Sequence, residues 1–226
     1  MMWIYQGRTQ IMNTNRPHQA EDNVALIDLL KSGDSTAEAE IIQRLEKHHS
    51  IKYFDELTQS CKFQLMLNLK LFPNAKEISE SMAMYSAIKN KLKLPLDGGF
   101  NCVVVGDGHT PRTASLIAMH SNYKCYSIDP NLKMKFTWKR IERLSMYDMK
   151  VESVSMKFNE HTIIILPHSH VNLKTCLEQI SAPSYTLITM DCCFDNSLGQ
   201  KPDIEYSDYA VWSAKNKIKI WENFKS

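Results

Sequence analysis

Two glycines and an aspartate follow an apolar run near the middle of the chain, and this combination is typical of a nucleotide-type cofactor site. Val103–Val105 lead into Gly106, Asp107 and Gly108. Glycines permit a tight turn and a close approach of the backbone to a ligand. About one βαβ unit later, Asp129 ends the next apolar run. Its carboxylate would accept hydrogen bonds from two ribose hydroxyls.

Two histidines and an aspartate follow other apolar runs and are candidates for catalysis. His168 and His170 come directly after the run Thr162–Leu166, and Asp191 comes directly after Thr186–Met190. An imidazole titrates near neutral pH, so either histidine is a candidate general base toward a hydroxyl or an amine. Asp191 or Cys192 would line the substrate pocket. The alternative is a helix N-terminus, capped by a serine, with two exposed imidazoles.

The same loops contain the residue types of a zinc site. Two imidazoles and two thiols, Cys192 and Cys193, follow neighbouring predicted strands. The spacing matches no known zinc pattern, and adjacent cysteines on an extended chain point in divergent directions. We therefore predict no tightly bound metal.

The elements that must position these residues alternate along residues 95–226, which predicts an α/β fold with a Rossmann-like, doubly wound, mostly parallel sheet. The predicted strands are Cys102–Val105, Cys125–Ile128, Val151–Val154, Thr162–Leu166 and Thr186–Met190. The predicted helices are Pro111–His120, Leu132–Tyr147 and Val171–Ile180. A C-terminal antiparallel hairpin is predicted from Tyr209–Trp212 and Ile218–Trp221, which flank Lys215-Asn216.

The N-terminal part of the chain follows a different pattern. Residues 1–20 are polar and lack periodicity, which predicts a flexible arm. Residues 21–94 predict a helical extension, in which Asn74–Leu92 has helical apolar spacing. Phe63–Phe72 is ambiguous, because its leucines alternate as in a strand while its composition favours a helix.

Composition bounds the class of protein. With 226 residues, 43% hydrophobic and 23% charged, the chain has an ordinary globular composition. A net charge of +2 permits a nucleic-acid partner without indicating one. We expect no membrane segment and no signal peptide, because no apolar run has the required length. Six thinly spread cysteines favour free thiols and a cytoplasmic location.

A basic stretch follows Asp129. Lys133, Lys135, Lys139, Arg140 and Arg143 surround Trp138 in the predicted helix. A nucleic-acid surface would combine such charge with an aromatic platform. A solvated helix face is the more common explanation of such a pattern.

The strand order, the glycine turn, the acidic residue after the second strand and the closing hairpin together resemble the class I S-adenosylmethionine-dependent methyltransferases. The resemblance covers residues 95–226. It implies methyl transfer from S-adenosylmethionine to an oxygen or nitrogen nucleophile. In that family the turn usually has an acidic residue where this chain has Val104, and a third glycine where it has Thr110.

The resemblance also implies which residues would contact the cofactor. Asp107 would offset the positive charge of the sulfonium, Arg112 would meet the carboxylate, and Asp129 would bind the ribose. Gly106, Gly108 and Thr110 complete the cofactor set. In the alternative, Thr110 caps a helix, Pro111 occupies its first turn and Arg112 is solvated.

Two other functions remain open. The departures at Val104 and Thr110 allow a catalytically inactive Rossmann-like module that acts through residues 1–94. A nicotinamide-dependent oxidoreductase is less favoured, because Pro111 removes a backbone N–H that a pyrophosphate would need at the helix start.

Overall fold

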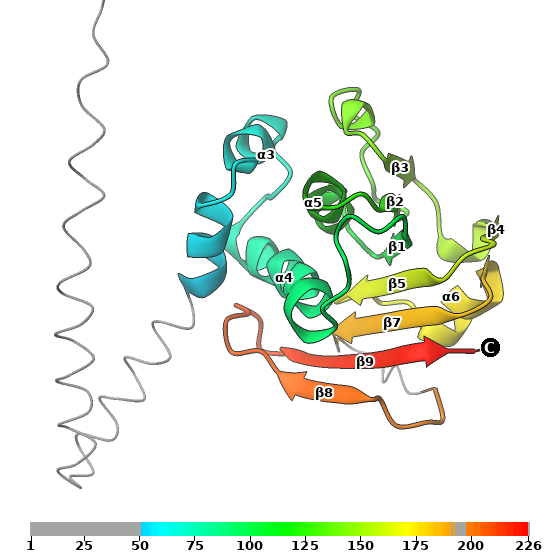
Figure 1. Cartoon of the computed structure of the whole chain (residues 1–226). Coiled ribbons are helices and arrows are strands. Elements are labelled where there is room, and N and C mark those ends of the chain that lie inside the picture. Colours follow the sequence, from blue (N-terminus) through cyan, green and yellow to red (C-terminus); the bar gives the residue numbers. More distant parts are fainter. Residues whose placement is uncertain (1–50, 191, 193–197, 226) are drawn as a thin grey trace, which may run out of the picture. The chain divides into compact units, whose positions relative to one another are not determined.

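The fold is built on one twisted sheet of seven strands in the order β3-β2-β1-β5-β7-β9-β8 (Figure 1). We describe it from a computed structural model, for residues 51–190, 192 and 198–225. The strands of this sheet are β1 (Asn101–Val105), β2 (Lys124–Ile128), β3 (Leu144–Tyr147), β5 (Thr162–Pro167), β7 (Tyr185–Met190), β8 (Ile204–Ser207) and β9 (Lys217–Phe224). Two short strands, β4 (Met156–Lys157) and β6 (Ile180–Ser181), pair separately.

The strand directions define where the chain changes course. β1 pairs in parallel with both β2 and β5, β2 with β3, and β5 with β7. The chain therefore moves from β1 to one edge of the sheet and returns to β5 on the other side of β1. In open parallel sheets, such a switch point opens a crevice at the carboxyl ends of the strands. Ligands bind there, so the ends of β1 and β5 mark the expected site.

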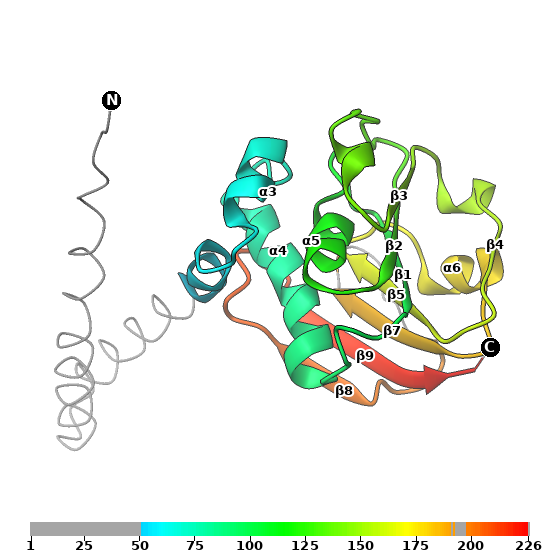
Figure 2. The same cartoon turned by 45° about the horizontal axis from the view of Figure 1, so that its top comes forward.

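Helices cover both faces of the sheet. They are α3 (Phe63–Leu69), α4 (Ala75–Ser86), α5 (Arg112–His120) and α6 (Leu173–Gln179). Short helical turns are η1 (Ala87–Lys91), η2 (Trp138–Arg140) and η3 (Val151–Ser153). Figure 2 shows α4 and α5 on one face of the sheet and α6 on the other. The sequence prediction of a Rossmann-like, doubly wound, mostly parallel sheet is confirmed.

Each face of β1 contributes to a different core. Cys102 and Val104 pack with α4 and α5, whereas Val103 and Val105 pack with α6 and η3. Successive side chains of a strand point to opposite faces, so a strand covered on both sides needs a continuous apolar run. This explains why the central strands were evident in the sequence.

The third strand and the following turn differ from the sequence prediction. The predicted helix Leu132–Tyr147 is wrong, because the chain there forms η2 and then β3, which pairs with β2. The predicted strand Val151–Val154 is also wrong, because it forms η3, a 3-10 turn. β3 is an edge strand with partly exposed side chains, so it lacks an apolar run. The valines are apolar because they fill the core beneath α6.

Residues 51–94 pack against the sheet. Residues 51–58 are helical, and α3 shows that Phe63–Phe72 is mainly helix. α4 confirms the helical prediction for the region after Asn74, whose side chain accepts a hydrogen bond from the Glu77 N–H. Side chains of this region share one core with β1 and β5. The division of the chain at residue 95 stays a prediction, and residues 1–50 lie outside the described part.

The C-terminal hairpin is antiparallel, as predicted, but its first strand lies earlier in the chain. β8 and β9 pair with Tyr206 opposite Ile218, and β9 also pairs with β7. Residues 209–212 are not a strand. Trp212 instead packs against Phe54 with ring centroids 4.8 Å apart. The backbone N–H of Trp212 donates to Ser79 Oγ at 2.9 Å. The connection between β8 and β9 therefore covers α4.

Among the described residues, no helix has both the length and the apolar composition needed to cross a bilayer.

Candidate functional site

The glycine turn after β1 is packed against atoms of the protein itself. Gly106 and Gly108 have φ values of +85° and +80°, which side-chain-bearing residues rarely adopt. A Cβ on Gly106 would lie 2.6 Å from Ser169 Oγ, and one on Gly108 would lie 2.7 Å from Arg112 Nη1. Both glycines are thus required by the fold alone. The contact also shows that the loop after β5 reaches the turn.

Asp107 organises the start of α5. Its carboxylate is fully buried and accepts hydrogen bonds from the Thr113 N–H at 2.9 Å, the Ala114 N–H at 3.1 Å and Ser127 Oγ at 3.0 Å. Burial raises the pKa of Asp107, and the Arg112 guanidinium opposes this shift. The alternative in which Thr110 caps the helix is wrong: α5 has Pro111 at its N-cap, and Thr110 Oγ1 has no hydrogen-bond partner in the described part of the chain.

Asp129 lies one residue beyond β2 and beside the turn. Its Oδ2 accepts from the Gly108 N–H and its Oδ1 from the Asn131 N–H, both at 2.8 Å. A carboxylate has about four lone-pair sites, so each oxygen retains one for a further donor. The residue is 8% exposed. Asp129 thus supports the turn and retains acceptor capacity.

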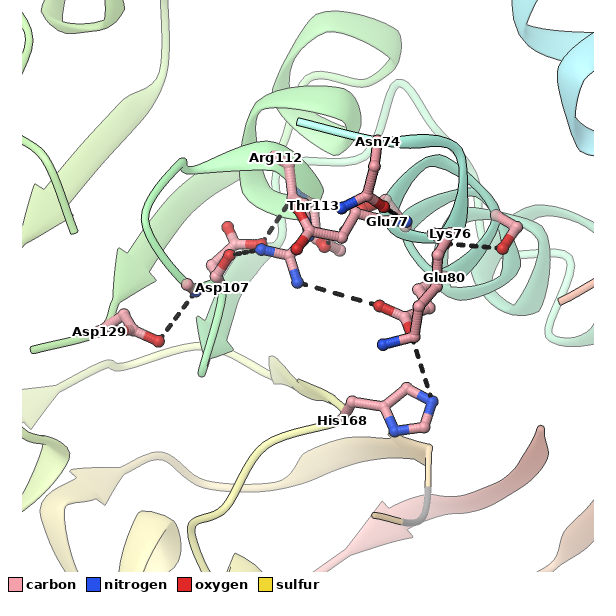
Figure 3. A network of polar contacts seen from close by, with 12 residues as sticks. Asn74, Lys76, Glu77, Glu80, Asp107, Arg112, Thr113, Asp129 and His168 are labelled. Carbon is pink, nitrogen blue, oxygen red and sulfur yellow. Dashed lines mark hydrogen bonds and ion pairs between the residues drawn. The ribbon is translucent and has the colours of Figure 1, made fainter. Parts of the chain in front are cut away.

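Arg112 belongs to a buried ion cluster, so the alternative in which it is solvated is wrong. Its guanidinium donates to the Asp107 carbonyl, and its Nε lies 3.6 Å from Glu77 Oε2. Its Nη2 lies 4.0 Å from Glu80 Oε2. Figure 3 shows the guanidinium between the turn and the two glutamates of α4. The cluster therefore joins α4 to the start of α5.

His168 joins this cluster from the other side. It follows β5 with a left-handed φ of 55°, a conformation that often marks functional sites when a residue other than glycine adopts it. Its Nε2 lies 3.5 Å from Glu80 Oε1 (Figure 3). Burial lowers the pKa of His168, and Glu80 partly opposes this. The imidazole is thus mainly neutral at neutral pH, so it can accept a proton.

Several buried polar atoms at this edge form no hydrogen bond with the described residues. They are Glu77 Oε2, Glu80 Oε1, Thr110 Oγ1, Arg112 Nε and His168 Nε2. Four of them have only ion-pair neighbours: Arg112 Nε lies 3.6 Å from Glu77 Oε2, and Glu80 Oε1 lies 3.5 Å from His168 Nε2 and 3.1 Å from Lys76 Nζ. Buried polar groups are normally hydrogen-bonded, so a group of such atoms indicates a place where water or a ligand supplies the missing bonds. They come from α4, from the start of α5 and from the loop after β5. The edge at the switch point is therefore polar and incompletely bonded.

Among the remaining candidates, His170 is exposed, and its Nε2 lies 3.9 Å from Cys192 Sγ. Asp191 and Cys193 lie outside the described residues. No group of three or more potential metal ligands is found among residues 51–190, 192 and 198–225. The absence of tightly bound zinc stays a prediction, which elemental analysis of the purified protein tests.

Glu77 and Glu80 were not among the sequence candidates. Glu80 has nevertheless a recognisable signal, since it is the sole charged residue between Ile78 and Ile88 on a helix with core-facing spacing. The residue is 1% exposed, and Lys76 Nζ lies 3.1 Å from its Oε1. A carboxylate is rarely buried without a partner. A single charge among the core-facing residues 79–87 is therefore a signal that could have identified Glu80.

Comparisons with known proteins add the following. No protein-family model matches the chain, and no curated protein matches it. A solved structure of an MtNAS variant in complex with S-adenosylmethionine is 9% identical with a TM-score of 0.48, and the match covers 83% of this chain and 79% of that one. A S-adenosylmethionine-dependent methyltransferase from Leishmania major is 12% identical with a TM-score of 0.42, covering 76% and 80%.

A third structure, from Anabaena variabilis and assigned as a methyltransferase of an antibiotic biosynthesis pathway, is 19% identical with a TM-score of 0.33. The match covers 48% of this chain and 45% of that one, so the chain spans less than half of its length. At these identities and TM-scores, function has to be inferred from the residues of the chain itself.

Proposed function

We propose that the chain binds S-adenosylmethionine at the carboxyl ends of β1, β2 and β5 and transfers its methyl group to an oxygen or nitrogen nucleophile. The observation that carries this proposal is the cluster of buried polar groups beside the glycine turn, at the switch point of the sheet, whose hydrogen bonds are incomplete among the described residues. The resemblance of residues 95–226 to class I methyltransferases supports the choice of cofactor.

The residues present fit the groups of this cofactor. Asp129 retains lone pairs for ribose hydroxyls, and the Arg112 guanidinium suits a carboxylate. Glu77 and Glu80 suit an ammonium group, and Thr110 Oγ1 is free to donate or accept. Asp107 supports the turn in this scheme instead of contacting the sulfonium. When bound, the cofactor supplies a methyl group on an already activated sulfonium.

The chain's own groups would prepare the acceptor. Neutral His168 accepts a proton from the acceptor hydroxyl or amine as general base. Glu80, 3.5 Å from His168 Nε2, stabilises the imidazolium that results. His170 and Asp191 follow β5 and β7 in the chain and are further candidates for contact with the acceptor.

The start of α5 argues against a dinucleotide cofactor. A pyrophosphate binds at a helix N-terminus through free backbone N–H groups. Here the Thr113 and Ala114 N–H groups already donate to Asp107, whose carboxylate would repel a phosphate. A phosphate-free cofactor does not require these groups. The geometry therefore favours adenosylmethionine over a nicotinamide dinucleotide.

A second candidate, a catalytically inactive module, is favoured by one observation. The Cβ positions of Gly106 and Gly108 are blocked by Ser169 and Arg112, so the glycines have a purely structural explanation. Binding measurements separate this function from the first.

The test is titration calorimetry of the full chain with S-adenosylmethionine, S-adenosylhomocysteine and NAD. We expect the first two to bind and NAD not to bind. Glu80→Gln should weaken binding, whereas Glu178→Gln on α6, on the opposite face of the sheet, should not. A folded protein that binds none of the three ligands would support the inactive module, and binding of NAD alone would overturn the proposed cofactor.

We also propose that the protein works in a reducing compartment such as the cytoplasm. Five cysteines within the described residues, Cys61, Cys102, Cys125, Cys176 and Cys192, are free thiols. Disulfides are rare in reducing compartments.

A further inference from the structure

Two cavities lie between α3 and the segment of residues 133–143. We call the two cavities together the α3 groove. The larger has a volume of about 660 Å³, and Lys70, Lys133 and Lys135 are among its lining residues. The smaller has a volume of about 470 Å³, and Lys62 and Arg140 are among its lining residues. Trp138 Nε1 donates to the Leu69 carbonyl at 2.8 Å, which holds the segment against α3. Figure 1 shows α3 and the chain preceding β3 near one end of the sheet.

Five cations of the α3 groove have no carboxylate partner among the described residues. Among residues 51–190, 192 and 198–225, none of Lys62, Lys70, Lys133, Lys135 and Arg140 forms an ion pair. The carboxylates that line the two cavities have other partners: Glu77 contacts Arg112, and Glu142 contacts Arg143, which lines the same cavity, at 3.3 Å. Five positive charges in two neighbouring cavities create a positive potential that attracts a partner with several negative charges.

Apolar and aromatic side chains accompany this charge. Leu65, Leu67 and Phe136 are 46%, 50% and 67% exposed. The Arg140 guanidinium lies over the Phe136 ring, 4.7 Å from its centroid. Trp138, the aromatic residue that stood out in the sequence, is fully buried, so Phe136 is the exposed ring. A cation and an exposed ring side by side form a surface on which a nucleobase can stack.

We propose that the α3 groove binds a single-stranded nucleic acid. Its phosphates would meet the lysines in the two cavities, and a base would stack on Phe136. The concave placement of the charges favours a flexible chain of phosphates over the flat surface of an anionic bilayer. His109 and Thr110 also line the larger cavity, so a bound strand would extend to the glycine turn. The binding itself does not depend on the proposed cofactor.

The test is fluorescence anisotropy of the full chain with a labelled uridine oligonucleotide of about 20 nucleotides, long enough to exceed a typical binding site. The affinity is measured between about 50 and 200 mM salt. Log K falls linearly with log salt, and each lost phosphate contact makes this fall less steep by about 0.7 for single strands. We expect Lys70→Ala/Lys133→Ala to reduce the magnitude of this slope by about 1.4. Phe136→Ala should weaken binding about tenfold without changing the slope.

The matched control is Lys157→Ala/Lys174→Ala. It removes the same charge from β4 and α6, and both lysines are exposed. Equal losses in the two double variants, or no oligonucleotide binding at low salt, would overturn the proposal.

Vesicles containing phosphatidylserine are titrated in parallel. Binding of vesicles without oligonucleotide, abolished by Lys70→Ala/Lys133→Ala, would overturn it in favour of a membrane surface. Deoxythymidine and uridine oligonucleotides distinguish DNA from RNA.

Discussion

At the scale of single residues, two aspartates close to the glycine turn have different surroundings. Asp107 is fully buried and its oxygens accept three hydrogen bonds from α5 and β2. Asp129 accepts two, one per oxygen, and is slightly exposed. Substitution of the first should therefore affect mainly stability, and substitution of the second should affect mainly ligand binding.

Asp129→Ala is expected to weaken S-adenosylhomocysteine binding about 10- to 150-fold, which corresponds to the loss of about 1.5–3 kcal/mol for hydrogen bonds to a charged group. Asp129→Asn retains an acceptor for the Gly108 N–H, so it should preserve the turn while still weakening binding. Calorimetric titration and thermal melting of both variants measure the two effects. An unchanged affinity per folded molecule in both variants would assign Asp129 a structural role only.

Asp107→Ala is expected to lower the free energy of unfolding by about 3–5 kcal/mol, because it leaves two buried N–H groups of α5 and the Ser127 hydroxyl without their acceptor. Urea unfolding measures the loss. Asp97→Ala is the control, because Asp97 is exposed, and it should change stability by less than about 0.5 kcal/mol. A loss as small as that of the control would show that the cap is dispensable.

At the scale of elements, the connection from β1 to α5 and the loop after β5 touch at Gly106 and Ser169. This contact joins the two strands that flank the switch point. It also brings His168 to α4, since His168 precedes Ser169 in the chain. The geometry of the site therefore depends on the packing of these two connections.

Gly106→Ala is expected to destabilise the fold more than Gly199→Ala. Gly199 has a similar φ of +73°, and no atom of the described residues lies within 4 Å of where its Cβ would be, so we expect alanine there to meet only the left-handed strain of about 1–2 kcal/mol. At Gly106 the Cβ also meets Ser169, which adds about 1–3 kcal/mol of overpacking. Denaturant unfolding compares the two, and Ser169→Gly should recover part of the difference. Equal losses would mean that the loop moves aside freely.

At the scale of the whole molecule, three partly buried histidines couple stability to pH. Burial lowers the pKa values of His120, His161 and His168 in the folded state. The unfolded chain therefore binds more protons as the pH falls through about 6.5, and its relative free energy drops. The stabilisation from the neutral imidazoles is fully present above about pH 6.5. It is lost as the pH falls from there through the lower pKa values of the folded state.

We expect the melting temperature to fall between about pH 7.5 and pH 5.5, measured by scanning calorimetry. His120→Gln/His161→Gln should show a smaller fall over the same range. Both substitutions lie outside the proposed site: His120 contacts Ser60 Oγ, and His161 contacts Ser184 and Thr186. An identical pH dependence in the double variant and the natural chain would contradict this assignment.

The sequence by itself determined the central part of the fold. β1, β2, β5 and β7 are buried on both faces or nearly so, and such strands require apolar runs that are visible without a structure. The glycine turn, the strand-end Asp129 and the antiparallel hairpin were also visible, because each depends on residue types that are close together in the sequence. β3 was missed because an edge strand with partly exposed side chains has no such run.

Only the tertiary structure decided the composition of the site. Glu80, Arg112 and His168 lie on three segments far apart in the chain, and their polar cluster exists because α4, the start of α5 and the loop after β5 meet at one sheet edge. The exposure of Phe136 and the burial of Trp138 likewise depend on how residues 133–143 pack against α3. Charge, burial and unpartnered atoms are properties of such contacts between distant segments, so no local pattern of residues could specify them.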